Sequence, residues 1–143
     1  MTVDRRAVPF KRWHYDWLTE QDAAEGLTMA IGAQTLTVLE RSNSWTGVVD
    51  GTPVVCAGTL EQWPGRHIAW AYVARGTLPH MTWITMAVLN NLAMVKGRIE
   101  LTVRADFRVG QRWARRLGFE VETPRLAAFG PQGEDHVGFV RIN

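Results

Sequence analysis

The sequence predicts an α+β domain in which helices flank a mixed, mostly antiparallel sheet. Two observations lead to this class. Strand patterns follow one another directly over residues 44–74 and again over 119–142, with turn signals between them. Helical patterns lie between these two runs instead of alternating regularly with single strands. Strands clustered in this way are expected to pair antiparallel, with the helices crossing the sheet.

Length and composition favour one domain that spans residues 1–143. Hydrophobic residues make up 46% of the chain and charged residues 21%, so a disordered protein is not expected. Cys56 is the single cysteine and lies in an apolar run, which predicts a buried thiol and no disulfide. Because the chain has neither an apolar run of 18 residues nor a signal-peptide pattern, we expect it to be neither membrane-spanning nor secreted.

The N-terminal part predicts one strand followed by one helix. Residues 11–18 are rich in aromatic side chains and are expected to form the first strand. Thr19 is a suitable N-cap for a helix that runs to about residue 37, because apolar residues recur at i, i+4, i+7 and i+8 from Ala23 onward. Two glycines inside this segment predict an irregularity or a break.

The next part predicts an antiparallel meander of three strands. Ser44–Asp50 and Thr52–Gln62 flank the pair Asp50-Gly51, a strong signal for a tight hairpin because its turn needs positive φ. The pair Pro64-Gly65 predicts the second turn, and His67–Ala74 the third strand.

The C-terminal half predicts two helices and three strands. Residues 80–95 are apolar nearly all round, which is typical of a helix buried on most sides. Arg98–Arg104 alternates between apolar and polar residues and predicts a strand, and a short basic helix is expected over 107–117. Two final strands are expected at about 119–129 and 135–142.

Residues 112–119, Arg-Trp-Ala-Arg-Arg-Leu-Gly-Phe, end the short helix that follows an alternating strand. This arrangement resembles the C-terminal half of the GCN5-related N-acetyltransferase (GNAT) superfamily. In its form the motif is similar to the acetyltransferase-like proteins encoded among the virion genes of tailed bacteriophages. The resemblance implies a GNAT-like fold over essentially the whole chain, located in a phage virion or in the host cytoplasm.

The resemblance leaves two functions open. The first is a degenerate, non-catalytic acetyltransferase-fold protein that acts as a virion or assembly component and requires no cofactor. The second is an N-acetyltransferase that moves an acetyl group from acetyl-CoA to an amine. In that case the loop before the central helix would bind the pyrophosphate, with Arg75, Gly76, Met81 and Thr82 as the expected contacts. The two positions that the family fills with glycine fall here on Pro79, which has no N–H donor, and on Met81, whose side chain would occupy phosphate space.

The resemblance also implies positions for a general acid and a general base. The family's tyrosine acid falls on Ala114, which cannot donate a proton, and its asparagine on Phe107 or Asp106. Glu61 is the candidate base, and the alternative is a solvated glutamate on an edge strand. His67 is a further titratable group at the start of a strand.

The four histidines have no HxH or HExxH spacing, so no metal site is expected. His67 and His80 are expected to flank one cleft, either as proton carriers or as structural histidines. His14 and His136 fall on the two terminal strands, with no link to that cleft.

Four arginines, Arg108, Arg112, Arg115 and Arg116, recur at i, i+4, i+7 and i+8 and define an arginine stripe on the short helix. The stripe is either a solvated helix face or an interface. A formal net charge of +2 favours a local contact with an acidic protein surface over nucleic acid. We therefore expect other phage virion proteins, or a second copy of the chain in a homo-oligomer, as partners.

Seven tryptophans are unusual for this length, and most are expected to pack in the core or between elements. The alternative is that some of them are anchors at a protein interface.

Overall fold

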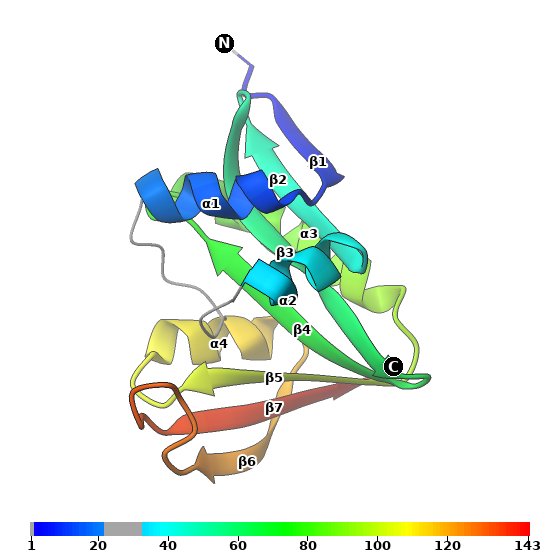
Figure 1. The fold of residues 1–143 in the computed structure, drawn as a ribbon, viewed down its shortest axis with the longest axis vertical. Helices are drawn as coiled ribbons and strands as arrows, with labels where there is room; N and C mark the ends of the chain where they lie inside the picture. Colours follow the sequence, from blue (N-terminus) through cyan, green and yellow to red (C-terminus); the bar gives the residue numbers. More distant parts are fainter. Residues whose placement is uncertain (1, 22–32) are drawn as a thin grey trace.

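The computed structural model describes residues 2–21 and 33–143 (Figure 1). Its elements are β1 (Arg5–Pro9), α1 (Arg12–Gln21), α2 (Ala33–Glu40), β2 (Asn43–Val49), β3 (Thr52–Trp63), β4 (Arg66–Val73), the 3₁₀ helix η1 (Leu78–His80), α3 (Met81–Ala93), β5 (Arg98–Arg104), α4 (Arg108–Arg116), β6 (Glu120–Leu126) and β7 (His136–Ile142). The strands form one sheet in the order β1-β2-β3-β4-β5-β7-β6. Every neighbouring pair is antiparallel except β4 and β5, so the expected α+β class is confirmed.

The two central strands, β4 and β5, pair over only part of their length. Their parallel ladder consists of three residue pairs: Arg66 with Arg98, His67 with Ile99, and Ile68 with Glu100. On their outer sides both strands stay paired much further, because β3 follows β4 to Val73 and β7 follows β5 to Arg104. The sheet therefore splits beyond this ladder into two intact halves.

Each face of the sheet has its own apolar core. On one face α3 and α4 bury Ile84, Val88 and Ala114 against the residues of β5 that alternate toward them. On the other face α1 and α2 bury Leu18 and Leu36 against strands β3 and β4, and Figure 1 shows these two helices crossing that half of the sheet. Among the described residues, no helix covers β5, β7 and β6 on the α1/α2 face.

Two turns of the predicted meander have the backbone conformation that their residues favour. Asp50 and Gly51 both have positive φ, at 48° and 81°, which is the combination that a two-residue hairpin turn requires. Gly65 forms the second turn with a φ of 93°. No described helix is long and apolar enough to cross a membrane.

The N-terminal prediction is wrong in its first strand. Residues 12–18 lie in a helix, α1, and the first strand is β1 at Arg5–Pro9. The buried residues of α1 are His14 and Leu18, which are one helical turn apart, so the burial follows a helical period although the composition is aromatic. Thr19 is not an N-cap but lies inside α1, where its hydroxyl donates to the carbonyl of Asp16.

Of the helix expected from Thr19 to about residue 37, the structure describes the two ends, which lie in α1 and α2. The apolar positions from Ala23 to Ile31 that predicted it, and both glycines, lie outside the described residues. The tryptophan prediction is confirmed. Trp45 and Trp70 are buried, and Trp17, Trp83 and Trp113 are half-buried and pack against the two cores, whereas Trp13 and Trp63 are each 58% exposed.

A buried polar chain joins α1 to the sheet. His14 Nδ1 accepts a hydrogen bond from the backbone N–H of Lys11, which caps the first turn of α1, and lies 2.8 Å from the hydroxyl of Thr46. That hydroxyl also contacts Cys56, which is fully buried as expected, and burial raises the pKa of its thiol to about 12.

Protonation of His14 should destabilise the fold. Burial, and next the charge of Lys11, lower the pKa of His14 from its ordinary 6.5, while Glu40 has a smaller opposite effect. The unfolded chain therefore binds this proton at a higher pH than the folded chain does. We expect the free energy of unfolding to hold above about pH 7 and to fall as the pH drops below the unfolded pKa, by at most about 1.4 kcal/mol per pH unit.

Urea unfolding across this pH range measures the effect, with His14→Asn as the matched variant, because an amide oxygen can still accept the Lys11 N–H. The variant should lose most of the dependence on pH. An equally steep fall in His14→Asn would show that another group is responsible.

Candidate functional site

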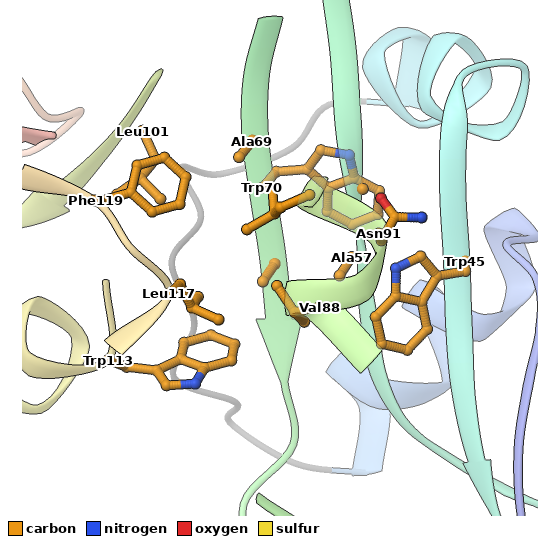
Figure 2. Close-up of a pocket in the computed structure, with 13 residues that line it drawn as sticks. Trp45, Ala57, Ala69, Trp70, Val88, Asn91, Leu101, Trp113, Leu117 and Phe119 are labelled. Atoms are coloured by element: carbon orange, nitrogen blue, oxygen red, sulfur yellow. The ribbon is translucent and has the colours of Figure 1, made fainter. Parts of the chain in front are cut away.

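The split between β4 and β5 is nearly filled on the α3/α4 face. Figure 2 shows Trp113, Leu117 and Phe119 on one side of it and Val88 with Trp70 on the other. The cavity that remains among them is about 20 Å³. A cavity of that size has room for about one water molecule. The diverging strands therefore do not leave an open channel on this face.

One hydrogen bond joins the two helices across this side of the split. The indole Nε1–H of Trp113, on α4, donates to the hydroxyl of Thr85, on α3, at 2.9 Å. Trp113 is half-buried and packs against the core of this face. Its ring therefore occupies the space between α3 and α4.

On the α1/α2 face of the same split, the described residues leave a groove. A groove of about 500 Å³ runs along the uncovered sheet between α2 and the β6–β7 connection. Its apolar lining includes Leu39 of α2, Leu60 of β3 and Phe129 beyond β6, and its polar lining includes Thr102 and Thr123. This volume lies within the range of small-molecule sites.

A chain of ion pairs lines the groove at the β4/β5 ladder. Arg66 and Arg98 both bind the carboxylate of Glu100, at 2.5 Å and 2.8 Å, and Arg98 also binds Glu122. The hydrogen bond from Arg66, followed by that from Arg98, lowers the pKa of Glu100 to about 2 although partial burial opposes the shift. Two arginines and two glutamates thus neutralise one another, so this part of the groove offers no net charge.

Trp70 lies between the two cavities and lines both of them. Its Nε1 is the buried side-chain polar atom that has no hydrogen-bond partner in the described structure.

The predicted cofactor residues lie together at the end of β4. Arg75 and Gly76 form the turn after the strand, where Gly76 has a φ of 76°, and Met81 and Thr82 begin α3. The hydroxyl of the buried Thr77 ties this loop down by donating to the carbonyl of Ala74 at 2.9 Å. Their role in binding acetyl-CoA stays a prediction.

The loop departs from a phosphate-binding geometry in two ways. Pro79 lies in η1 and supplies no N–H there. His80, at the N-cap of α3, accepts hydrogen bonds from Arg5 of β1 through its Nδ1. The Met81 side chain is half-buried and packs against the core. Pro79 and the contact between His80 and Arg5, taken with the filled split, are the features that do not fit acetyl-CoA.

The structure does not bring Glu61 to the cofactor loop. Glu61 pairs with His67 in the β3/β4 ladder, its carboxylate lies 3.9 Å from His67 Nε2, and its side chain is 58% exposed. The loop follows the opposite end of β4, about 23 Å away along an extended strand. This placement is what a solvated strand glutamate would have, and the role of base stays a prediction.

The remaining candidate groups are also dispersed. His67 and His80 do not flank one cleft, because His67 lies at the start of β4 and His80 lies in η1, beyond the other end of that strand. Ala114 is fully buried, and Asp106 is held by Arg104 at 2.8 Å. His14 lies on α1 and not on a strand.

His136 begins β7, the last strand, as predicted. It lies 3.2 Å from the Oγ1 atom of Thr102, a residue that lines the groove. In the described part of the chain, no three His, Cys, Asp or Glu side chains are grouped as a metal site would need.

Solved structures with this architecture are acetyltransferases. Ard1 from Thermoplasma volcanium aligns with a TM-score of 0.76 at 14% identity, over 96% of this chain and 97% of that chain. The ribosomal-protein-S18-alanine N-acetyltransferase from Escherichia coli aligns at 0.72 and 15%, over 96% and 92%. The IAA acetyltransferase from Bacillus cereus aligns at 0.66 and 14%, over 97% and 98%. No protein-family model and no curated protein matches the chain. At these identities the likeness shows the fold, which is the GNAT fold.

The bridge between α3 and α4 should be measurable as a coupling energy. We expect Thr85→Val and Trp113→Phe to interact by about 1 kcal/mol in a double-mutant cycle on the free energy of unfolding, because either change alone removes the same hydrogen bond. Thr85→Val combined with Val109→Ala, at an exposed residue of α4, serves as the control and should be additive. Additivity in the first cycle would mean that the bridge is absent in solution.

Proposed function

We propose that this chain is a non-catalytic protein with an acetyltransferase fold, which acts by binding as a component of a tailed-phage virion or of its assembly. The observation that carries the proposal is the filled split, where a cavity of about 20 Å³ remains on the α3/α4 face. The arm of a coenzyme A thioester is many times larger than the one water that this space admits. Retained acetyl transfer would need this space.

The residues at the expected positions of the general acid and the general base also support the proposal. Ala114 stands where the resemblance puts the acid, and it has neither a proton to donate nor contact with solvent. Glu61 lies at the other end of β4 from the loop that begins α3. A general base must lie within hydrogen-bond reach of the proton that it removes, directly or through one water. An acetyltransferase fold that lacks a placed general acid and general base is better suited to binding than to acetyl transfer.

The phage setting rests on the resemblance of residues 112–119 to acetyltransferase-like virion proteins. The partner that we propose for this chain is another virion protein or a second copy of the chain, and not nucleic acid.

The groove on the α1/α2 face favours a second candidate, an acetyl-CoA-dependent N-acetyltransferase. Its volume of about 500 Å³ would accommodate an acceptor amine. Proteins of the same fold include one named as an N-acetyltransferase of an alanine. In this alternative the contact between Trp113 and Thr85 would have to open, and Glu61 would have to reach the amine from the far end of β4.

Acetyl-CoA should not raise the melting temperature of the full chain, even at millimolar concentration. A ligand present at 100 times its Kd would add about 2.7 kcal/mol to the free energy of unfolding, which a thermal melt detects as a shift of several degrees. Such a shift, together with an acetyl transfer that Glu61→Gln abolishes without loss of stability, would contradict the proposal and support the enzyme. A flat titration and an unchanged Glu61→Gln variant are the expected results.

A further inference from the structure

No described carboxylate neutralises the arginine stripe of α4. Five arginines elsewhere in the described structure do bind carboxylates. These ion pairs are Arg6–Asp4, Arg66–Glu100, Arg98–Glu122, Arg104–Asp106 and Arg125–Asp135. Arg108, Arg112 and Arg116 are exposed and form no ion pair with the described part of the chain. Arg115 is also exposed, and its guanidinium lies over the ring of Phe139 at 5.8 Å.

The stripe lies on the outer face of α4. Gly110 and Ala114 are the buried residues of this helix, and the arginines lie on the opposite side of the helical wheel. From residue 108 to residue 116 the stripe is about 12 Å long at the rise of an α-helix. Val109 lies at the edge of this face and is 60% exposed. The surface is therefore a row of cations with an apolar residue beside it.

The stability of α4 does not account for the stripe. Arginines at i and i+4 repel each other, which applies to Arg108 with Arg112 and to Arg112 with Arg116. Arg108 also lies in the first turn, where the helix dipole disfavours a cation and where α4 has no acidic residue. The dipole favours only Arg115 and Arg116, in the last turn.

We propose that the arginine stripe is a docking surface for a carboxylate-rich surface of another protein. Charge complementarity specifies the partner, because four guanidinium groups without carboxylates can each bind one in a bidentate manner. Exposed Val109 and the half-buried Trp113 beside it favour a protein, since protein interfaces are enriched in arginine and tryptophan while nucleic-acid interfaces are more polar. The low net charge of +2 agrees with a local contact. This inference adds a partner class to the proposed function.

Poly-L-glutamate and a short DNA duplex are the probes, titrated against the full chain at several salt concentrations. The test variant is Arg112→Glu with Arg116→Glu. Its matched control is Arg41→Glu with Lys96→Glu, two exposed cations away from α4 that give the same change in net charge. We expect the test variant to bind poly-L-glutamate about tenfold more weakly, while the control stays within about twofold of wild type.

Several results would overturn the proposal. These are equal losses in both variants, no binding of poly-L-glutamate by the wild type, or tighter binding of DNA with a slope near about −3.6 against log salt, which four neutralised phosphates predict. Self-association that the test variant abolishes would identify a second copy as the occupant. If the melting temperature of the test variant is below that of the wild type, Arg112→Gln with Arg116→Gln takes its place. Acetyl-CoA plays no part in this test, so it can fail independently of the proposed function.

Discussion

The structure depends on the short parallel ladder between β4 and β5. Three residue pairs hold the two halves of the sheet together, and beyond Ile68 and Glu100 the strands no longer bond to each other. Beyond the ladder, the edges of β4 and β5 that face each other must be covered by side chains. On the α3/α4 face Trp113, Leu117 and Phe119 fill the split, whereas on the α1/α2 face the described residues leave a groove. One break in the sheet thus gives a filled face and, among the described residues, an uncovered face.

Much of the fold could be predicted because its signals are local. The strand Arg98–Arg104 alternates cleanly and was predicted with its observed bounds, and Asp50-Gly51 specifies its hairpin through positive φ. The prediction of the first strand is wrong because aromatic composition is typical of strands, whereas the buried residues His14 and Leu18 lie one helical turn apart. The partial pairing of β4 and β5 has no local signal, since it depends on two strands that α3 separates in the chain.

The features of the candidate site could also be predicted only where their signals lie within one segment of the chain. The loop that the resemblance assigns to the cofactor could be placed at the end of β4 because its residues lie close together in the chain, and Ala114 could be placed on α4 because it belongs to a motif. The bridge from Trp113 to Thr85 joins side chains 28 residues apart and could not be found from either segment alone. The alternation of β5 could have placed Arg98 and Glu100 on one face, but their ion pairs and the groove depend on how distant elements pack.

The central claim is that the α3/α4 side of the split is closed to acetyl-CoA. The indole N–H resonances of Trp113 and Trp70 report on the two walls of this space in a ¹H–¹⁵N NMR spectrum, with Trp13, which is 58% exposed on α1, as an internal reference. On addition of millimolar acetyl-CoA the account predicts that the Trp113 and Trp70 resonances stay in place. A saturable shift of both, with the Trp13 resonance unmoved, would show that the cofactor enters the split and would contradict the account.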